Sequence, residues 1–212
     1  MGYRPLFFFP AMTIAVLLAI GFFKLYGRAT RPDVPTPVSA TVAHFAPGVA
    51  LGVPMKQSAA ALRGAAWIPN VGYVGALPGN RTVAQVRLFP GAAERAKAAA
   101  SEDAPVAGVE MVSVKSEDMP RAMQDLGIVF RGAPKDGCII PVYAEAPFRR
   151  VMYWTTKNDR GGVALISDWK RQGPPRPGLV VWSMLAWAGP FKGSETLLAN
   201  FDARSCLTVA GT

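Results

Sequence analysis

The sequence holds few of the side chains that most catalytic and metal sites need. Its 212 residues include two cysteines and a single histidine. A histidine-rich metal site or a Ser-His-Asp triad is not easily assembled from one histidine. No CxxC, HExxH, GxSxG or glycine-rich phosphate-binding pattern occurs either. We therefore expect a protein that is not an enzyme, with no catalytic residues, no metal ligands and no cofactor.

Charged residues are also scarce, at 17% of the chain with a net charge of +9. Because a typical domain has about 25%, this composition favours a surface that lipid or partner proteins cover. A compact domain with many turns is the alternative, since the chain has 21 glycines and 19 prolines. The basic residues form no long run, and no helix-turn-helix, zinc-finger or RNP pattern accompanies them. We expect no nucleic acid among the partners.

One long stretch, residues 5–23 with the sequence PLFFFPAMTIAVLLAIGFF, carries no charge. As a helix it would reach about 28 Å, close to the hydrocarbon thickness of a bilayer. It is too long for the apolar core of a usual signal peptide, and no cleavage site of the A-x-A type follows it before Lys24. The sequence therefore predicts an uncleaved, single-pass transmembrane anchor over residues 1–28. Aromatic and basic side chains are expected at its membrane interfaces: Tyr3, Phe22, Phe23, Lys24, Tyr26, Arg28 and Arg31.

Small residues recur along this stretch at four-residue spacing, at Ala11, Ala15 and Ala19. Such a stripe lets a second helix approach closely, although alanine is also common in helices of this kind. The predicted partners are integral membrane protein subunits and the lipid bilayer.

The side of the membrane is indicated by two features that disagree. The basic residues after the anchor favour a cytoplasmic C-terminal domain. The even cysteine pair, Cys138 and Cys206, indicates a disulfide in an exported domain, with two buried thiols as the alternative. We expect the bacterial inner membrane, with the domain in the periplasm.

Residues 29–47 are predicted to be a proline-rich linker. Pro32, Pro35 and Pro37 favour an extended polyproline II spacer. His44 lies in this linker and is expected to be incidental.

Residues 48–212 are predicted to form a soluble α+β domain, an antiparallel sheet with two or three helices. Two halves, 48–105 and 106–212, share an order of strand, helix and hairpin, which indicates either a duplication or an order common in such domains. The hydrophobic pattern predicts strands at 71–76, 82–89, 109–114, 138–143, 150–156, 163–168 and 179–187. The first two are predicted to form a hairpin around the turn Pro78-Gly79-Asn80. The imperfect alternation in 82–88 indicates a bulge or burial on both faces. Helices are predicted at 56–63, 116–126 and 194–203.

Residues 47–90 resemble the BamE/SmpA-like outer-membrane-assembly lipoprotein domain. The resemblance is carried by the turn PGVALG at 47–52, a helix beginning near Met55, and the strand segments at 73–75 and 83–86. It implies an exported α+β interaction module. The chain departs from that family in its uncharged N-terminal stretch, where the family has a lipidated cysteine, and in its longer second half. No functional residue carries over.

Two features of the second half are candidates for partner contact. Trp182 and Trp187 lie five residues apart on a predicted strand, so they face opposite sides and one ring is a candidate for an exposed anchor. The stiff basic loop with Pro174, Pro175 and Arg176 either contacts a partner or only connects two strands.

We expect a non-catalytic single-pass accessory subunit that stabilises a larger bacterial membrane protein complex, for example a photosynthetic reaction centre with its antenna. The alternative is an envelope assembly or chaperone-like factor that binds client proteins transiently by strand addition.

Overall fold

The computed structural model describes residues 34–69, 71–91, 94, 101–113, 118–141, 148–158, 160–172 and 176–189. The chain divides into two compact units, Met1–Pro32 and Asp33–Thr212. All described residues belong to the second unit.

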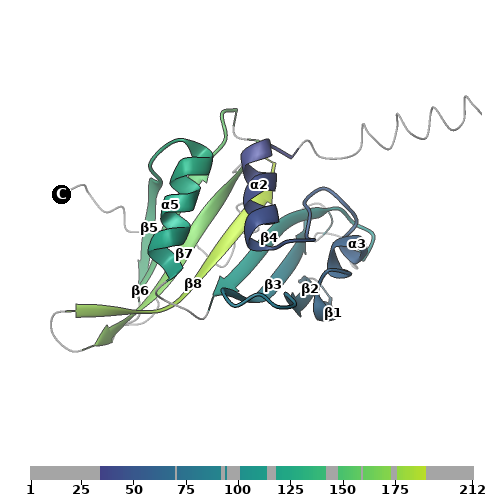
Figure 1. The fold of residues 1–212 in the computed structure, drawn as a ribbon, viewed down its shortest axis with the longest axis horizontal. Coiled ribbons are helices and arrows are strands. Elements are labelled where there is room, and N and C mark those ends of the chain that lie inside the picture. The colour runs from purple at the N-terminus through teal and green to yellow at the C-terminus, as the bar shows by residue number, and fades with distance from the viewer. Residues whose placement is uncertain are drawn as a thin grey trace, which may run out of the picture. The chain divides into compact units, whose positions relative to one another are not determined.

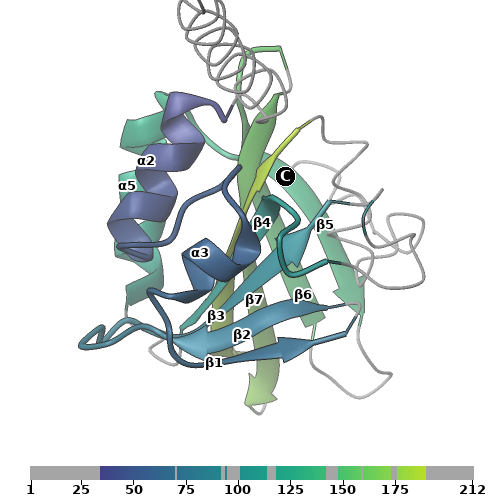
Figure 2. The same ribbon diagram turned by 90° about the vertical axis from the view of Figure 1, so that its right-hand side faces the viewer.

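The second unit is built on one antiparallel sheet of eight strands in the order β1-β2-β3-β4-β8-β7-β6-β5 (Figures 1 and 2). The strands are β1 Arg63–Ile68, β2 Gly72–Ala76, β3 Val83–Pro90, β4 Val106–Ser113, β5 Lys135–Pro141, β6 Phe148–Thr155, β7 Gly161–Gln172 and β8 Arg176–Ala188.

The sheet consists of two four-stranded meanders, β1–β4 and β5–β8, joined where β4 pairs with β8. At this junction the register runs from Gly108 opposite Trp187 to Ser113 opposite Trp182. Each meander follows a helical segment, so the two halves share their order of elements. The division differs from the expected one, because β4 ends the first half and does not begin the second.

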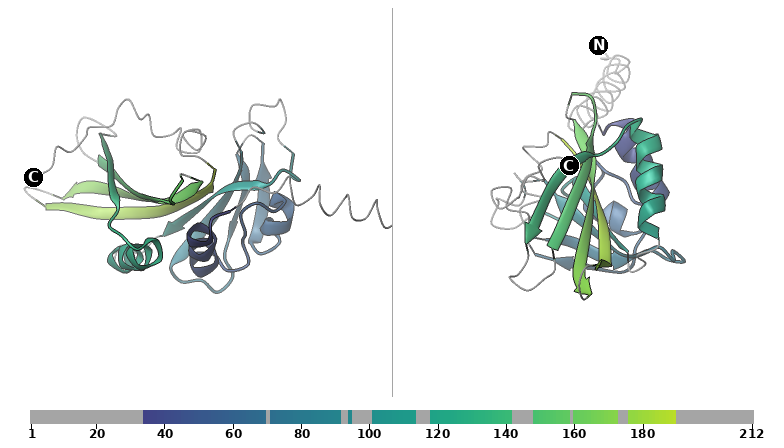
Figure 3. Two further views of the ribbon diagram at one scale, coloured as in Figure 1. Left: turned by 90° about the horizontal axis from the view of Figure 1, so that it is seen from above. Right: turned by 90° about the vertical axis from the view of Figure 1, so that its left-hand side faces the viewer.

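The helices α2 Thr36–Phe45, α3 Met55–Ala59 and α5 Met119–Phe130 lie on one face of the sheet (Figure 3). The first and last of them lie side by side, α2 against β7 and β8 and α5 against β6. The short helix α3 packs against β2 and β3.

The expectation that residues 29–47 form an extended linker is wrong, because helix α2 lies within this range and packs into the core. Pro35 occupies the N-cap position and Pro37 the first turn, where a missing N–H costs nothing. Val38 and Val42 then point at the sheet and are buried. The buried Thr41 hydroxyl donates to the Pro37 carbonyl oxygen over 2.9 Å, so its burial leaves no polar group unpaired. The prolines begin a helix here and do not build an extended spacer.

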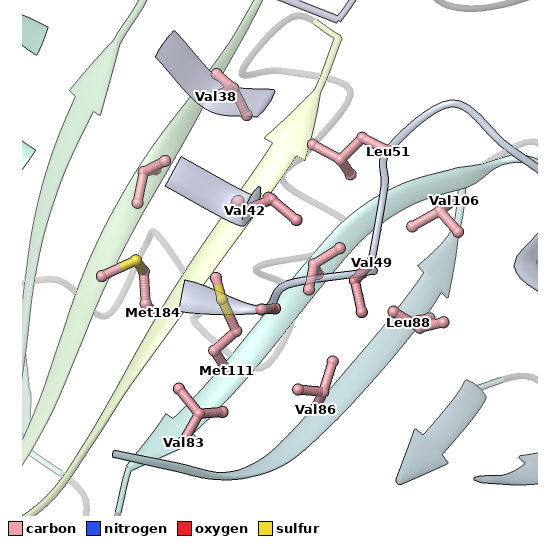
Figure 4. Packing of buried hydrophobic residues seen from close by; sticks show 14 of the residues in the cluster. Val38, Val42, Val49, Leu51, Val83, Val86, Leu88, Val106, Met111 and Met184 are labelled. Carbon is pink, nitrogen blue, oxygen red and sulfur yellow. The ribbon is translucent and has the colours of Figure 1, made fainter. Parts of the chain in front are cut away.

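The main core lies between these helices and the sheet. Alternate residues of the strands supply it, in accordance with the two-residue repeat of a β-strand. Figure 4 shows side chains from α2, β3, β4 and β8 gathered on this face, among them Val38, Val42, Val86, Leu88, Met111 and Met184.

A second buried cluster lies on the opposite face of β6, β7 and β8. It consists of Val151, Ala164, Ile166, Leu185 and Trp187. These strands are therefore buried on both faces, which explains why β7 is apolar almost continuously over 161–166.

The expected fold class, an α+β domain behind a transmembrane helix, is wrong for the described chain. The structure is a large antiparallel sheet with short helices, and no helix of the described residues is long and apolar enough to cross a membrane. The longest, α5, has 12 residues, whereas a span needs about 20. The expected anchor, with its packing residues and interface residues, lies outside the described residues: Tyr3, Ala11, Ala15, Ala19, Phe22, Phe23, Lys24, Tyr26, Arg28 and Arg31.

The expected hairpin is confirmed by the antiparallel pairing of β2 with β3. Of the two alternatives for residues 82–88, a bulge or burial on both faces, the structure has a register shift in β3 between Val83 and Gln85. The helix expected to end at Gly127 continues to Phe130 as α5, because the ring of Phe130 lies 6.5 Å from that of Trp154 and this packing outweighs the poor helix propensity of glycine. The expected helix at 194–203 lies outside the described residues.

We expect Val42→Ala to lower the free energy of unfolding by about 2 kcal/mol, because it removes two buried methyl groups from α2 and leaves a cavity. Chemical denaturation of the full chain measures this change. The matched control is Ser39→Ala on the exposed side of the same helix, which should stay within about 0.5 kcal/mol of wild type. Equal, small effects of both variants would show that α2 is a detached spacer.

Candidate functional site

A polar cleft of about 260 Å³ lies where the end of α2 meets the start of α5 and the turn between β2 and β3. We call it the α2–α5 cleft. Its lining residues are His44, Phe45, Asn80, Thr82, Val83, Asp118, Arg121, Ala122 and Asp125.

Helix α5 and the residue that begins it supply the charged wall of the cleft. Asp118, Arg121, Ala122 and Asp125 are spaced three, four and seven residues along the chain, so they share one helix face. Asp118 occupies the N-cap position, where a carboxylate interacts favourably with the helix dipole. Ala122 is buried and, together with the buried Val83 of β3, gives the cleft an apolar floor.

Helix α2 supplies the opposite wall through its last two residues. The His44 Nε2 atom lies 3.7 Å from the Asp125 Oδ2 atom, and the two side chains are 65% and 33% exposed. The rings of His44 and Phe45 are in edge contact at 4.7 Å. A surface pair of this kind stabilises the fold by at most about 1 kcal/mol, and it brings the Asp125 carboxylate toward α2.

Asn80 fixes the third side of the cleft. Its Oδ1 atom accepts the backbone N–H groups of Thr82 and Val83, each over 2.9 Å, which holds the turn before β3. Its Nδ2 atom donates to the Phe45 carbonyl oxygen over 3.3 Å and so ties the turn to the end of α2.

The cleft therefore offers charges of both signs around a small apolar floor. A histidine beside an aspartate also occurs in general-base catalysis. Within the described ranges, however, no group of three histidine, cysteine or acidic side chains could hold a metal ion. The arrangement suits the binding of a charged ligand. This site was not predicted from the sequence, because His44 was expected to lie in a spacer and no local pattern links residues 44, 80 and 125.

A second feature is the strand β1, which ends the sheet on one side (Figure 2). We call Arg63–Ile68 the β1 edge. All but one of its residues are exposed, and Trp67 is half-buried. Ile68 and the following Val71 are large apolar side chains that are 42% and 36% exposed. After Arg63 the strand has no charged residue and no proline, although these are the residues that usually protect an edge from pairing with another strand.

The other edge of the sheet, β5, has such protection. It begins with the exposed Lys135 and ends with Pro141. Proline cannot donate a backbone hydrogen bond, and a lysine on an edge opposes the approach of another strand. The β1 edge also begins with a charged residue, Arg63, and its register shifts before Ala66, whereas residues 64–68 carry neither charge nor proline.

Tyr73 of β2 holds the β1 edge in place. Its ring lies 5.2 Å from that of Trp67, and its hydroxyl donates a hydrogen bond to the Glu102 carboxylate. This hydrogen bond, followed by burial and by the negative charge of Glu102, raises the pKa of Tyr73 to about 12.

The expected contact residues of the second half do not form a surface. Trp182 and Trp187 lie on opposite faces of β8, and both are buried, with 1% and 0% exposure. The expectation that one ring would be an exposed anchor is therefore wrong, because both sides of β8 are covered. Arg176 begins β8, while Pro174 and Pro175 lie outside the described residues.

The predicted disulfide between Cys138 and Cys206 is not tested by the described residues. Cys138 lies on β5, and Cys206 lies outside the described residues.

No known family, no curated protein and no solved structure matches this chain. The resemblance of residues 47–90 to outer-membrane-assembly lipoproteins stays an expectation.

We expect the free energy of unfolding to fall as the pH rises from 10 to about 12, and to fall less in Tyr73→Phe. The folded-state pKa of Tyr73 is raised above the ordinary value of 10.0. Its contribution is therefore complete below pH 10 and is lost as the pH approaches the folded-state pKa. Denaturation of both proteins at a series of pH values measures the difference. An equal fall in the two proteins would contradict the Tyr73–Glu102 interaction.

Proposed function

We propose that this chain is a non-catalytic accessory subunit that binds a partner protein through the β1 edge. The observation that carries the proposal is that β1 ends the sheet, is exposed at every residue except Trp67 and has no charge or proline after Arg63. An edge strand leaves a row of backbone N–H and C=O groups unpaired, and an extended segment of another chain can pair with them.

The side chains around the edge favour the same kind of partner. Trp67, Ile68 and Val71 supply apolar surface at the end of β1 and in the turn that follows. In strand addition, backbone hydrogen bonds provide affinity and alternate side chains provide specificity. The contact between Trp67 and Tyr73 keeps the edge ordered before a partner arrives, which lowers the entropic cost of binding.

We infer that the partners are subunits of a bacterial membrane protein complex, with the domain on the periplasmic side of the inner membrane. The low share of charged residues, 17% of the chain, supports this class of partner, because the part of a surface that partner proteins cover is depleted in charge. A transient envelope assembly factor would use the same edge. The two differ in lifetime, since an accessory subunit stays bound at a fixed ratio through purification.

We expect Ile68→Lys to reduce recovery of the partner at least tenfold when the tagged chain is purified in mild detergent from its own host. The lysine places a charge on the open edge, where an incoming strand would have to bury it. Quantitative mass spectrometry of the purified material measures the recovery.

The matched control is Ile128→Lys, which makes the same substitution at a 68% exposed position on α5. Circular dichroism confirms that both variants fold. A stable partner that is recovered equally with Ile68→Lys and wild type would refute binding through the β1 edge.

A further inference from the structure

We propose that the α2–α5 cleft binds a small zwitterion of amino-acid size, with Arg121 contacting its carboxylate and Asp125 its ammonium group. This inference concerns a surface separate from the β1 edge and does not depend on the partner-binding role.

The charges of the cleft favour a ligand that carries both signs. Among the described residues, Arg121 has no ion pair, and the only ion pair of Asp125 is the 3.7 Å contact with His44. The charge of Asp118 is already favoured by its position at the start of α5. One guanidinium and one carboxylate thus remain for a ligand. A guanidinium binds a carboxylate with two parallel hydrogen bonds, which makes Arg121 well suited to the acidic end.

The size and floor of the cleft restrict the ligand further. Drug-sized ligands occupy pockets of about 300–1,000 Å³, and the 260 Å³ of this cleft falls below that range. Val83, Ala122 and Phe45 line it with apolar atoms, so a short aliphatic side chain has a place to pack. A polyanion would face two aspartates, and a simple diamine would face Arg121.

The cleft is also held in shape without a ligand. His44 contacts Asp125 from the opposite wall, and Asn80 links the β2–β3 turn to the end of α2 by hydrogen bonds at both ends of its amide. Positioning the Asp125 carboxylate and the walls of the cleft in advance lowers the cost of ordering them on binding.

Leucine and two derivatives that each lack one of its charges test the proposal. Leucinamide lacks the carboxylate, and N-acetyl-leucine lacks the ammonium group. Nuclear magnetic resonance titration of the full chain follows the signals of His44 and Asp125. We expect leucine to bind saturably with a dissociation constant below 10 mM, and both derivatives to bind at least tenfold more weakly. Absence of saturation by leucine at 10 mM, or equal binding of leucinamide, would overturn the proposal.

Two substitutions assign the contacts. In Arg121→Gln, leucine and leucinamide should bind equally, because the carboxylate has lost its partner; Arg121→Lys should keep part of the preference. In Asp125→Asn, leucine and N-acetyl-leucine should bind equally. Lys56→Gln, an exposed change on α3, is the matched control and should leave the order of the three probes as in wild type. An unchanged preference in both cleft variants would contradict the assigned roles.

The partner-binding variant separates this proposal from the previous one. Ile68→Lys should bind leucine as wild type does, because β1 contributes no residue to the cleft. Loss of leucine binding in Ile68→Lys would refute the independence of the two sites.

Discussion

The pairing of β4 with β8 is the interaction on which the rest of the described fold depends. It joins residues that are far apart in the sequence along the register from Gly108–Trp187 to Ser113–Trp182. This pairing places Met111 opposite Met184 at the centre of the sheet, and both side chains are buried beneath the helical face. Without this pairing, each meander would be a four-stranded sheet with half of a core. Pairing two strands so far apart in the sequence costs loop-closure entropy, which the burial of this shared core offsets.

Both proposed sites follow from the same junction. With β4 and β8 at the centre, β1 and β5 become the two edges of the sheet. β5 has a lysine and a proline that oppose pairing with another strand, whereas β1 has no charge or proline after Arg63. The junction also brings the helices that precede the two meanders together on one face. The α2–α5 cleft forms where the end of one helix meets the beginning of the other.

The sequence predicts the elements whose signals are local. The turn at Pro78–Asn80 and the apolar residues beside it identify the β2–β3 hairpin, and the central strands of the second half are recognisable by their β-branched and aromatic residues. It does not predict β1, since Gly64, Ala65 and Ala66 show no alternation when both faces are exposed. Helix α2 is obscured by its prolines, which suit a first turn as well as a spacer. The cleft could not be foreseen, because its residues meet only through the distant β4–β8 pairing and carry no local motif.

Hydrogen exchange of the β1 amides, in the free chain and in the complex purified with its partner, tests the central claim most directly. Alternate backbone groups of an edge strand have no partner within their own sheet. We expect the amides of residues 63–68 that face away from β2 to exchange rapidly in the free chain and to become strongly protected in the complex, while those of the β4–β8 junction are slow in both. Protection elsewhere on the domain, with unchanged exchange along β1, would contradict it.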